Sequence, residues 1–497
     1  MDLEHNTSQG VPWATAQIPR PRHRHDFEIA LICALRVERD AVEALLDEEY
    51  ETNGFSYGKA PRDTNAYTTG RIGHHYVVLA YLQRAGKASS ANVVSMIRTS
   101  FEGIKVVLVV GICGGVPVTA DGKEILLGDV IVSSGIVVPI DYGRQYPDRF
   151  IRKDTQEDNL GRADLEIEAF LGKVSGQTVL PRLKDKTACY TTELCRKDKL
   201  QKSTYPGPGN DKLFPPGYRH KHHKLNSCSI CTRSPNQDKD ICDIARTSSC
   251  AELGCDESQL VRRDRVEKAK GLELGESTTM NALEVEEARK ASIHLGAFAS
   301  GDVVMKCGQH RDKIAAVEKV IAFEMEGAGA WDILPTILVK SVCDYADSHK
   351  NKQWQGYASV TAAACTKALL EEWRSADRSM EAAETASSFN TPGSPISLAR
   401  SRTIMTQEEQ GCSMWSRRSS TAHSNSKFGS LLHSSTSLNH SGGSYWEFLT
   451  VEGLEWYGLI WSEIPKAPGD YITCEFFATV TPVTRKGFPY FFFLQQF

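Results

Sequence analysis

The chain has 497 residues, enough for two to three average domains, although single α/β units of about 250 residues are common. Its net charge of −4 gives no global reason to expect a membrane or nucleic-acid partner, and no apolar run reaches the roughly 18 residues of a bilayer span. The N-terminal 21 residues lack the apolar core of a signal peptide, so we expect a cytoplasmic protein whose 14 cysteines are free thiols.

The N-terminal part predicts a disordered arm followed by a strand and a helix. Residues 1–25 are polar, and the apolar run 27–35 has the length and character of a strand buried on both faces. Residues 36–50 follow helical spacing, which places Glu38 in the turn between strand and helix, at the carboxyl edge of a sheet. The alternative is that Glu38 is simply an acid favoured by the helix dipole.

A hairpin and a second helix follow. Residues 65–72 and 75–80 predict two strands joined by a tight turn. The segment 84–90, RAGKASS, leads into a helix at 90–100, and its glycine and hydroxyl side chains suit an anion-binding helix N-terminus. It lacks the upstream glycine of a Walker loop, so a nucleotide-driven motor domain is excluded.

The middle of the domain predicts two further strands and a short helix. Residues 105–110 form a β-type run that ends in the glycine-rich segment 111–115, where a ligand can approach the backbone closely. A simple tight turn is the alternative for these glycines. Residues 128–138 predict the next strand, and residues 165–171 a short helix.

Two carboxylates stand at the end of a strand near residue 325. A strand broken at residues 300–302 and a helix at 310–319 precede the stretch 321–331, IAFEMEGAGAW. If the strand continues through this stretch, alternation turns Glu324 and Glu326 to the same side, before a small-residue segment that opens a helix. The alternative for the tripeptide Glu324-Met325-Glu326 is a solvent-exposed strand end that carries two acids without a function.

The last strand of the domain, 337–342, ends next to Asp344, and an amphipathic helix at 358–373 closes the pattern. Strands that alternate with helices predict a three-layer α/β/α sandwich around a largely parallel sheet. Glu38, Glu326 and Asp344 all stand at strand ends, where such proteins place ligand groups. If these strand ends converge, the three acids form one site.

A charged insertion interrupts the domain at about residues 172–292. Between residues 182 and 270 it holds 19 Lys and Arg against 12 Asp and Glu, and seven cysteines lie between residues 189 and 255. Cys228 and Cys231 have the C-x2-C spacing of tetrahedral zinc ligands, and later cysteines could complete a site. Unliganded thiols in a loop are the alternative, and a zinc-stabilised nucleic-acid contact is a third reading of the insertion.

The C-terminal part changes in composition. Residues 375–444 are rich in Ser and Thr and predict a disordered linker. Residues 445–497 are rich in aromatic side chains and predict either a small β unit or a tail without a fold of its own.

Eight motifs in this order resemble the nucleoside phosphorylase/nucleosidase superfamily, which includes the purine/uridine phosphorylase family. They are ICALRVERDAVEALL, AYTTGRIG, LVVGICGGVP, EILLGDVIVSSGIV, DYGRQYPD, ASGDVVMK, IAFEMEGAGAWD and VCDYADSHKNKQWQ. The resemblance covers about residues 26–374 outside the insertion. It is strongest to the fungal branch found in NLR-like receptors and to methylthioadenosine/S-adenosylhomocysteine nucleosidases, and it implies an α/β sandwich around a twisted mixed sheet.

The resemblance implies cleavage of the N-glycosidic bond of a nucleoside, most often a purine nucleoside, without a cofactor and in a homo-oligomer. It assigns Glu38 to activation of water, Glu326 with Met325 to the ribose hydroxyls, and Asp344 to the base. Val304 and Met305 match the base pocket. The turn beside the sugar matches Ile112, Cys113 and Gly114.

The chemistry agrees with these roles, because an oxocarbenium-like sugar needs a nearby carboxylate and the departing base needs a proton. Asp344 must be protonated to donate, which burial would favour, whereas Glu38 must stay ionised. Phosphorolysis would also need a phosphate clamp, for which Arg71, Arg84 and Ser89 are candidates by position only. Glu38 favours water as the nucleophile. A catalytically silent module that senses nucleosides with the same pocket is the competing function.

Overall fold

The computed structural model describes residues 18–374, except 53–54, 156, 225–227, 233–240, 274–286 and 288, together with four short strands between residues 432 and 479. Contacts divide the chain into two units, residues 1–390 and 391–497. The predicted N-terminal arm falls outside the described residues up to residue 17, and so do most of the predicted linker and tail. None of the described helices is long and apolar enough to cross a bilayer.

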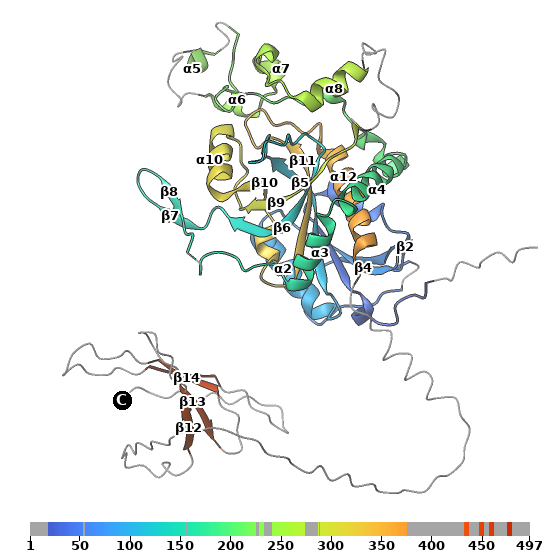
Figure 1. Ribbon diagram of the computed structural model, residues 1–497, viewed down its shortest axis with the longest axis vertical. Coiled ribbons are helices and arrows are strands. Elements are labelled where there is room, and N and C mark those ends of the chain that lie inside the picture. The colour runs from blue at the N-terminus through green and yellow to red at the C-terminus, as the bar shows by residue number, and fades with distance from the viewer. Residues whose placement is uncertain are drawn as a thin grey trace, which may run out of the picture. The chain divides into compact units, whose positions relative to one another are not determined.

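The first unit is built on a nine-stranded mixed sheet (Figure 1). In the order of the sheet its strands are β10 (Val320–Glu324), β9 (Ile293–Ser300), β6 (Val130–Pro139), β11 (Thr336–Asp344), β5 (Val106–Gly115), β1 (Ile29–Cys33), β4 (His75–Tyr81), β3 (Tyr67–Ile72) and β2 (Glu48–Glu49). A separate small hairpin joins β7 (Gly143–Gln145) to β8 (Phe150–Arg152).

Helices cover both faces of the sheet, because its central strands are apolar on both sides. One face packs against α1 (Arg36–Glu43), α3 (Leu165–Val174), α4 (Val179–Cys195) and α12 (Gln355–Glu372). The other packs against α2 (Lys87–Ser100) and α11 (Gly327–Ala330). The predicted three-layer α/β/α sandwich is therefore confirmed.

The predicted helix over residues 36–50 is wrong in its second half. Helix α1 ends at Glu43, and Glu48 and Glu49 form the short strand β2, which pairs antiparallel with Arg71 and Gly70 of β3. The open edge of β3 offers these residues backbone hydrogen bonds that outweigh the helical spacing of their side chains.

Strand direction brings several strand ends to one edge of the sheet. Strands β1, β5 and β11 run parallel to one another, so their carboxyl ends lie side by side. The end of β10 curls back onto this edge, where Ala322 and Phe323 pair antiparallel with Gly115 and Gly114 of β5. The carboxylates predicted at separate strand ends are thus carried to one place.

The insertion is folded against this domain. Helix α4 packs along α12, and four short helices gather at one end of the unit (Figure 1). They are α5 (Ser229–Thr232), α6 (Asp243–Thr247), α7 (Cys250–Leu253) and α8 (Asp264–Glu273). Helix α10 (Gly308–Glu318) precedes β10.

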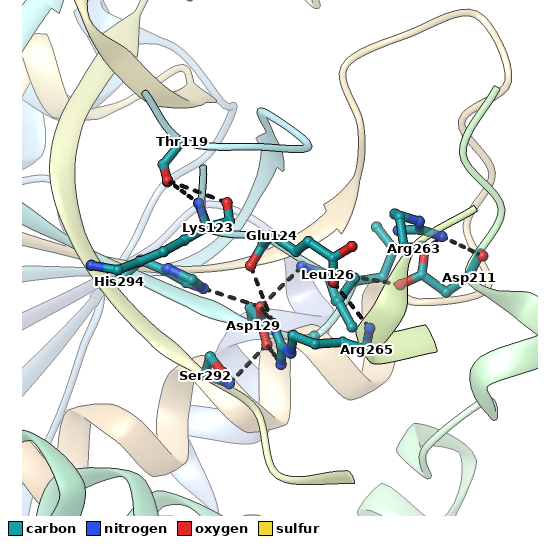
Figure 2. Close-up of polar contacts among 12 residues, drawn as sticks. Thr119, Lys123, Glu124, Leu126, Asp129, Asp211, Arg263, Arg265, Ser292 and His294 are labelled. Carbon is teal, nitrogen blue, oxygen red and sulfur yellow. Dashed lines mark hydrogen bonds and ion pairs between the residues drawn. The ribbon is translucent and has the colours of Figure 1, made fainter. Parts of the chain in front are cut away.

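Two buried carboxylates fasten the insertion to the sheet (Figure 2). Asp129 accepts hydrogen bonds from Arg265 at 2.6 and 3.0 Å, from the backbone N–H of Ser292 and from His294 Nε2. Asp211 lies in the insertion, where it accepts a hydrogen bond from Arg263 Nη2 at 2.8 Å, and its Oδ2 accepts the backbone N–H of Leu127, just before β6, at 3.1 Å. Burial alone would raise the pKa of Asp129, but Arg265 and His294 hold that pKa well below its usual range.

Beyond the first unit, the structure describes four strands. β12 (Leu432–Thr436) pairs antiparallel with β13 (Glu447–Val451), and β14 (Tyr457–Trp461) pairs antiparallel with β15 (Glu475–Thr479). The first of them lies within the segment predicted to be a linker.

Candidate active site

A cavity of about 300 Å³ opens where the ends of β1, β5, β10 and β11 meet. This volume is in the range of sites for small molecules. Most of the residues assigned from the sequence line it together: Glu38, Ile112, Gly114, Val304, Met305, Met325, Glu326 and Asp344.

Glu38 is fixed by the backbone around it. Its Oε2 accepts hydrogen bonds from the N–H groups of Ala34 and Leu35 at 2.9 and 2.7 Å, and its Oε1 accepts one from Ile112 at 2.8 Å. A Cβ on Gly111 would lie 2.1 Å from Oε1, so this position of β5 requires glycine. Burial raises the pKa of Glu38 and outweighs Lys340 and the backbone donors, which lower it.

A buried lysine stands behind the carboxylates. Lys340 comes from the middle of β11, is 1% exposed, and lies 2.9 Å from Glu326 Oε2 and 4.0 Å from Glu324 Oε2. Burial alone would lower the pKa of Lys340, but the charges of Glu326, Glu38 and Glu324 raise it well above its usual range. Three of the acids that line the cavity, Glu38, Glu324 and Glu326, therefore surround one buried cation behind the cavity wall.

Glu324 and Glu326 have different tasks although both are buried. Strand β10 ends at Glu324, whose carboxylate accepts the backbone N–H groups of Glu326 and Gly327 at 2.8–3.0 Å. Glu324 thus closes the turn into α11, and burial raises its pKa. Glu326 makes no such cap and pairs with Lys340 at the cavity.

Asp344 is the last residue of β11 and is 5% exposed. Its Oδ1 accepts the backbone N–H of Ala346 at 2.9 Å, and its Oδ2 lies 3.0 Å from Lys350 Nζ. Ala346 has a φ of +52°, a left-handed conformation that alanine seldom adopts. The loop that follows Asp344 is therefore held in a shape that must be supported from outside.

Four of the residues assigned to the substrate or to phosphate lie outside the cavity lining that the described residues form. Cys113 points into the core because it alternates with Ile112 and Gly114 along β5. Arg71 lies on β3, where its guanidinium forms ion pairs with Asp47 and Glu48. Ser89 lies within α2. Arg84 is exposed next to Ala85, which lines the cavity.

The predicted anion site at the start of α2 already holds a carboxylate of the protein. Asp302 Oδ1 accepts the backbone N–H of Lys87 at 2.8 Å, and a Cβ on Gly86 would lie 2.9 Å from the same oxygen. Lys87 Nζ forms an ion pair with Asp141. The first turn of α2 and its lysine are thus engaged by internal acids.

Two clusters of histidine and cysteine have the composition of metal sites. The predicted pair Cys228 and Cys231 lies with His222 and Cys242, and a second cluster joins His220, Cys250, Cys255 and His349. In each cluster the ligand atoms lie within 4.8 Å of one another. Either set of four cysteine and histidine ligands could hold zinc.

Sequence reasoning missed Lys340, Lys350 and His349. A lysine within the apolar run ILVKSV was a signal, because a buried lysine is rare unless acids surround it. Lys350 and His349 follow Asp344 in the same motif. Lys350 pairs with Asp344 across an irregular loop, and His349 meets His220, 129 positions away, so no regular spacing indicated either residue.

Comparison with known proteins relates part of this chain to a described family. Residues 28–185 match the family described as the Phosphorylase superfamily. A nucleotide-binding leucine-rich repeat (NLR)-like protein of Hyaloscypha variabilis is 27% identical over 350 residues, which are 69% of this chain and 29% of that protein's length. The chain therefore spans less than a third of this relative.

Two solved structures are similar at low sequence identity. Futalosine hydrolase of Helicobacter pylori is 14% identical, with a TM-score of 0.38 over 70% of this chain and 99% of that one. The MTA/SAH nucleosidase of Streptococcus pneumoniae is 17% identical, with a TM-score of 0.35 over 70% of this chain and 100% of that one. From the family match, residues 28–185 carry a domain of the Phosphorylase superfamily.

Proposed function

We propose that this cavity cleaves the N-glycosidic bond of a nucleoside, with a purine as the preferred base and water as the nucleophile. The observation that carries the proposal is that Glu38, Glu326 and Asp344, from three distant segments, line one cavity. The match of residues 28–185 to the Phosphorylase superfamily supports it.

Glu326 is suited to the sugar. Its buried carboxylate can accept hydrogen bonds from the ribose hydroxyls, and its negative charge stabilises the positive charge that develops on the sugar during cleavage. Lys340, 2.9 Å away, fixes one oxygen of this carboxylate and balances its charge inside the protein. The second oxygen is then the one that faces the substrate.

Glu38 and Asp344 divide the proton transfers. Glu38, in ionised form, would take a proton from the attacking water, and its three backbone hydrogen bonds hold it in one orientation. Asp344 would serve the nitrogen of the departing base. Lys350 lies 3.0 Å from Asp344 and can offset negative charge on this side of the cavity.

Hydrolysis is favoured over phosphorolysis by the groups around α2. The N-terminus of this helix donates to Asp302, and Lys87 pairs with Asp141, so both groups already have anionic partners. Arg71, one of the three clamp candidates named from the sequence, is paired with acids on the sheet edge. A phosphate would have to displace these carboxylates.

The test is incubation of the chain with a panel of purine and pyrimidine nucleosides and nucleotides, with and without phosphate. We expect free base together with ribose. Ribose 1-phosphate in place of ribose would assign phosphorolysis, and no free base from any substrate would reject the enzymatic proposal.

A nucleoside-sensing module is the second candidate. The ion pair between Lys350 and Asp344 favours it, because an acid that stays paired with an internal lysine cannot donate a proton to the base. The 27% identity to an NLR-like protein is in keeping with a receptor context. Saturable nucleoside binding without release of base would select this candidate.

We also infer that Cys228 and Cys231 hold a structural zinc ion with His222 and Cys242. His222 Nδ1 lies 3.6 Å from both Cys231 Sγ and Cys242 Sγ, as expected for ligands of one tetrahedral ion. Replacing Cys228 and Cys231 by serine should remove one equivalent of zinc. Zinc content unchanged by the double substitution would show that this pair is not a site.

A further inference from the structure

The second cluster joins the insertion to the loop that carries Asp344. His220, Cys250 and Cys255 belong to the insertion, whereas His349 follows Asp344 by five positions. All four side chains are buried or half-buried. The cluster is therefore a contact between two segments that are far apart in the sequence.

The spacing of the four atoms fits one tetrahedral ion. Zinc–nitrogen bonds of about 2.0–2.1 Å and zinc–sulfur bonds of about 2.3 Å place ligand atoms roughly 3.3–3.8 Å apart. The two Nδ1 atoms lie 3.2 Å apart. Cys250 Sγ lies 3.5 and 3.7 Å from the imidazole nitrogens, and Cys255 Sγ 3.7 and 4.0 Å.

Hydrogen bonds orient both imidazoles for metal binding. His220 Nε2 lies 2.9 Å from the carbonyl oxygen of Ser248, and His349 Nε2 lies 3.2 Å from that of Tyr218. A carbonyl oxygen only accepts, so each Nε2 carries a hydrogen, and in the neutral imidazole each Nδ1 then presents a lone pair to the cluster. Two facing lone pairs repel, and a cation between them satisfies both together with the two sulfurs.

We propose that His220, Cys250, Cys255 and His349 form a second zinc site, which clamps the insertion onto the loop from Asp344 to Lys350. Zinc binds as two thiolates and two neutral imidazoles, and the two thiol protons are released to solvent. Only the consequence for catalysis depends on the proposed function of the cavity; the metal site itself does not.

The loop needs such support from outside. Ala346 is held at a φ of +52°, and Ala346 and Lys350 both line the cavity. The insertion also contacts this loop through Phe214, whose ring stacks on His349 at 4.3 Å, and through Tyr345, which bonds Asp211 and Arg263. A metal bound to His349 would fix the residue next to Lys350 and thus place its ammonium beside Asp344.

The experiment measures metal in the full chain. Protein purified with zinc and then dialysed should hold two zinc ions per chain, one for each cluster. H349A should lower this to one, and C250S should do the same. H349C, which replaces one ligand type by another, should restore the second ion. C307S, at an exposed cysteine outside both clusters, is the matched control and should keep both ions.

Two further readouts separate the sites from each other and from catalysis. Cobalt in place of zinc should give a difference spectrum between parent and H349A typical of tetrahedral Cys2His2 ligation. Hydrogen exchange in residues 344–350 should speed up in H349A and not in the variant lacking Cys228 and Cys231.

No zinc in the parent, a zinc content that H349A and C250S leave unchanged, or no change in exchange of the loop would overturn the proposal. These results would hold whether or not the chain cleaves nucleosides. A failure of the catalytic proposal is seen separately, as a chain that binds two zinc ions and releases no base.

Discussion

The cavity and the insertion hold the same loop in different ways. From the cavity side, Asp344 fixes the loop by accepting the N–H of Ala346 and pairing with Lys350. From the insertion side, Arg263 and Asp211 hold Tyr345, and the cluster of His220, Cys250 and Cys255 meets His349. The cavity side thus holds the loop through charged groups at strand ends. The insertion side holds it through cysteine and histidine side chains and a buried ion pair.

This difference indicates which substitutions should affect catalysis and which should affect the order of the loop. A change in the cavity removes a charge next to the substrate and leaves the packing in place. A change in the insertion leaves the charges in place and loosens the segment that positions them. The four predictions below test this division, from the largest expected effect to the smallest.

Asp344→Asn should lower turnover by about 10²–10⁴, the usual scale for a positioned acid, because the amide cannot donate a carboxylic proton. Nucleoside binding should change less than turnover, since the amide keeps the size of the side chain and can still accept the N–H of Ala346, although it loses the ion pair with Lys350. Steady-state kinetics together with calorimetric binding would measure both effects.

Asp332→Asn, at an exposed acid outside the cavity lining, is the control and should behave as the parent. Near-normal turnover of Asp344→Asn on every substrate of the parent would remove Asp344 from the proton transfer.

Arg263→Met should lower the free energy of unfolding by about 3–5 kcal/mol, because it leaves the carboxylate of Asp211 buried without its cation. Both side chains are 3% exposed, so solvent cannot replace the lost partner. Denaturant titration measures this loss.

The double variant Arg263→Met with Asp211→Asn should recover part of the stability, as expected when both charges are removed. If the single change costs less than about 1 kcal/mol, this ion pair within the insertion does not stabilise the fold.

The sequence predicted the parts of these regions that depend on local pattern. Alternating strands and helices identified the layers, and acids at strand ends identified Glu38, Glu326 and Asp344. The C-x2-C spacing found Cys228 and Cys231, whose partners His222 and Cys242 lie within 20 residues of one another. Each of these signals lies within one short segment.

The remainder depends on tertiary contacts. His349 lies 129 positions from His220, so no spacing rule joins them. Lys340 looked like an interior residue of a strand, and its acids come from other elements. The strand β5 continues through the predicted glycine turn because Gly114 and Gly115 pair with β10, and this continuation turns Cys113 into the core.

Glu326→Gln should weaken binding and turnover together, because each charge-assisted bond to a ribose hydroxyl contributes about 1.5–3 kcal/mol. Discrimination between ribosides and 2′-deoxyribosides should shrink, which a ratio of kcat/KM values measures.

Glu324→Gln is the matched comparison, since Glu324 caps backbone N–H groups at the same turn. It should lower stability and keep the preference for ribosides. If Glu326→Gln kept that preference too, the ribose assignment would be wrong.

The pH dependence of kcat/KM should report Glu38, whose pKa is raised by burial. Glu38 acts as a base in its ionised form, so kcat/KM should increase as the pH rises through the pKa of Glu38, which lies above the ordinary range of glutamate. At lower pH, kcat/KM should be low. The raised pKa also means that Glu38 contributes stability below its ordinary pKa, and that this contribution is lost as pH rises.

Glu38→Gln should abolish that stability change along with most activity, whereas Glu49→Gln, at an exposed acid of β2, should alter neither. If the residual activity of Glu38→Gln still decreases at low pH in the same way, another group causes this decrease.

The most direct test of the account is the product analysis of the parent chain with a purine riboside in phosphate-free buffer. We expect free base and free ribose in equal amounts, formed at a rate that Asp344→Asn lowers at least about 100-fold. Tight nucleoside binding with neither product, at full zinc content, would contradict the account and leave the cavity as a sensor.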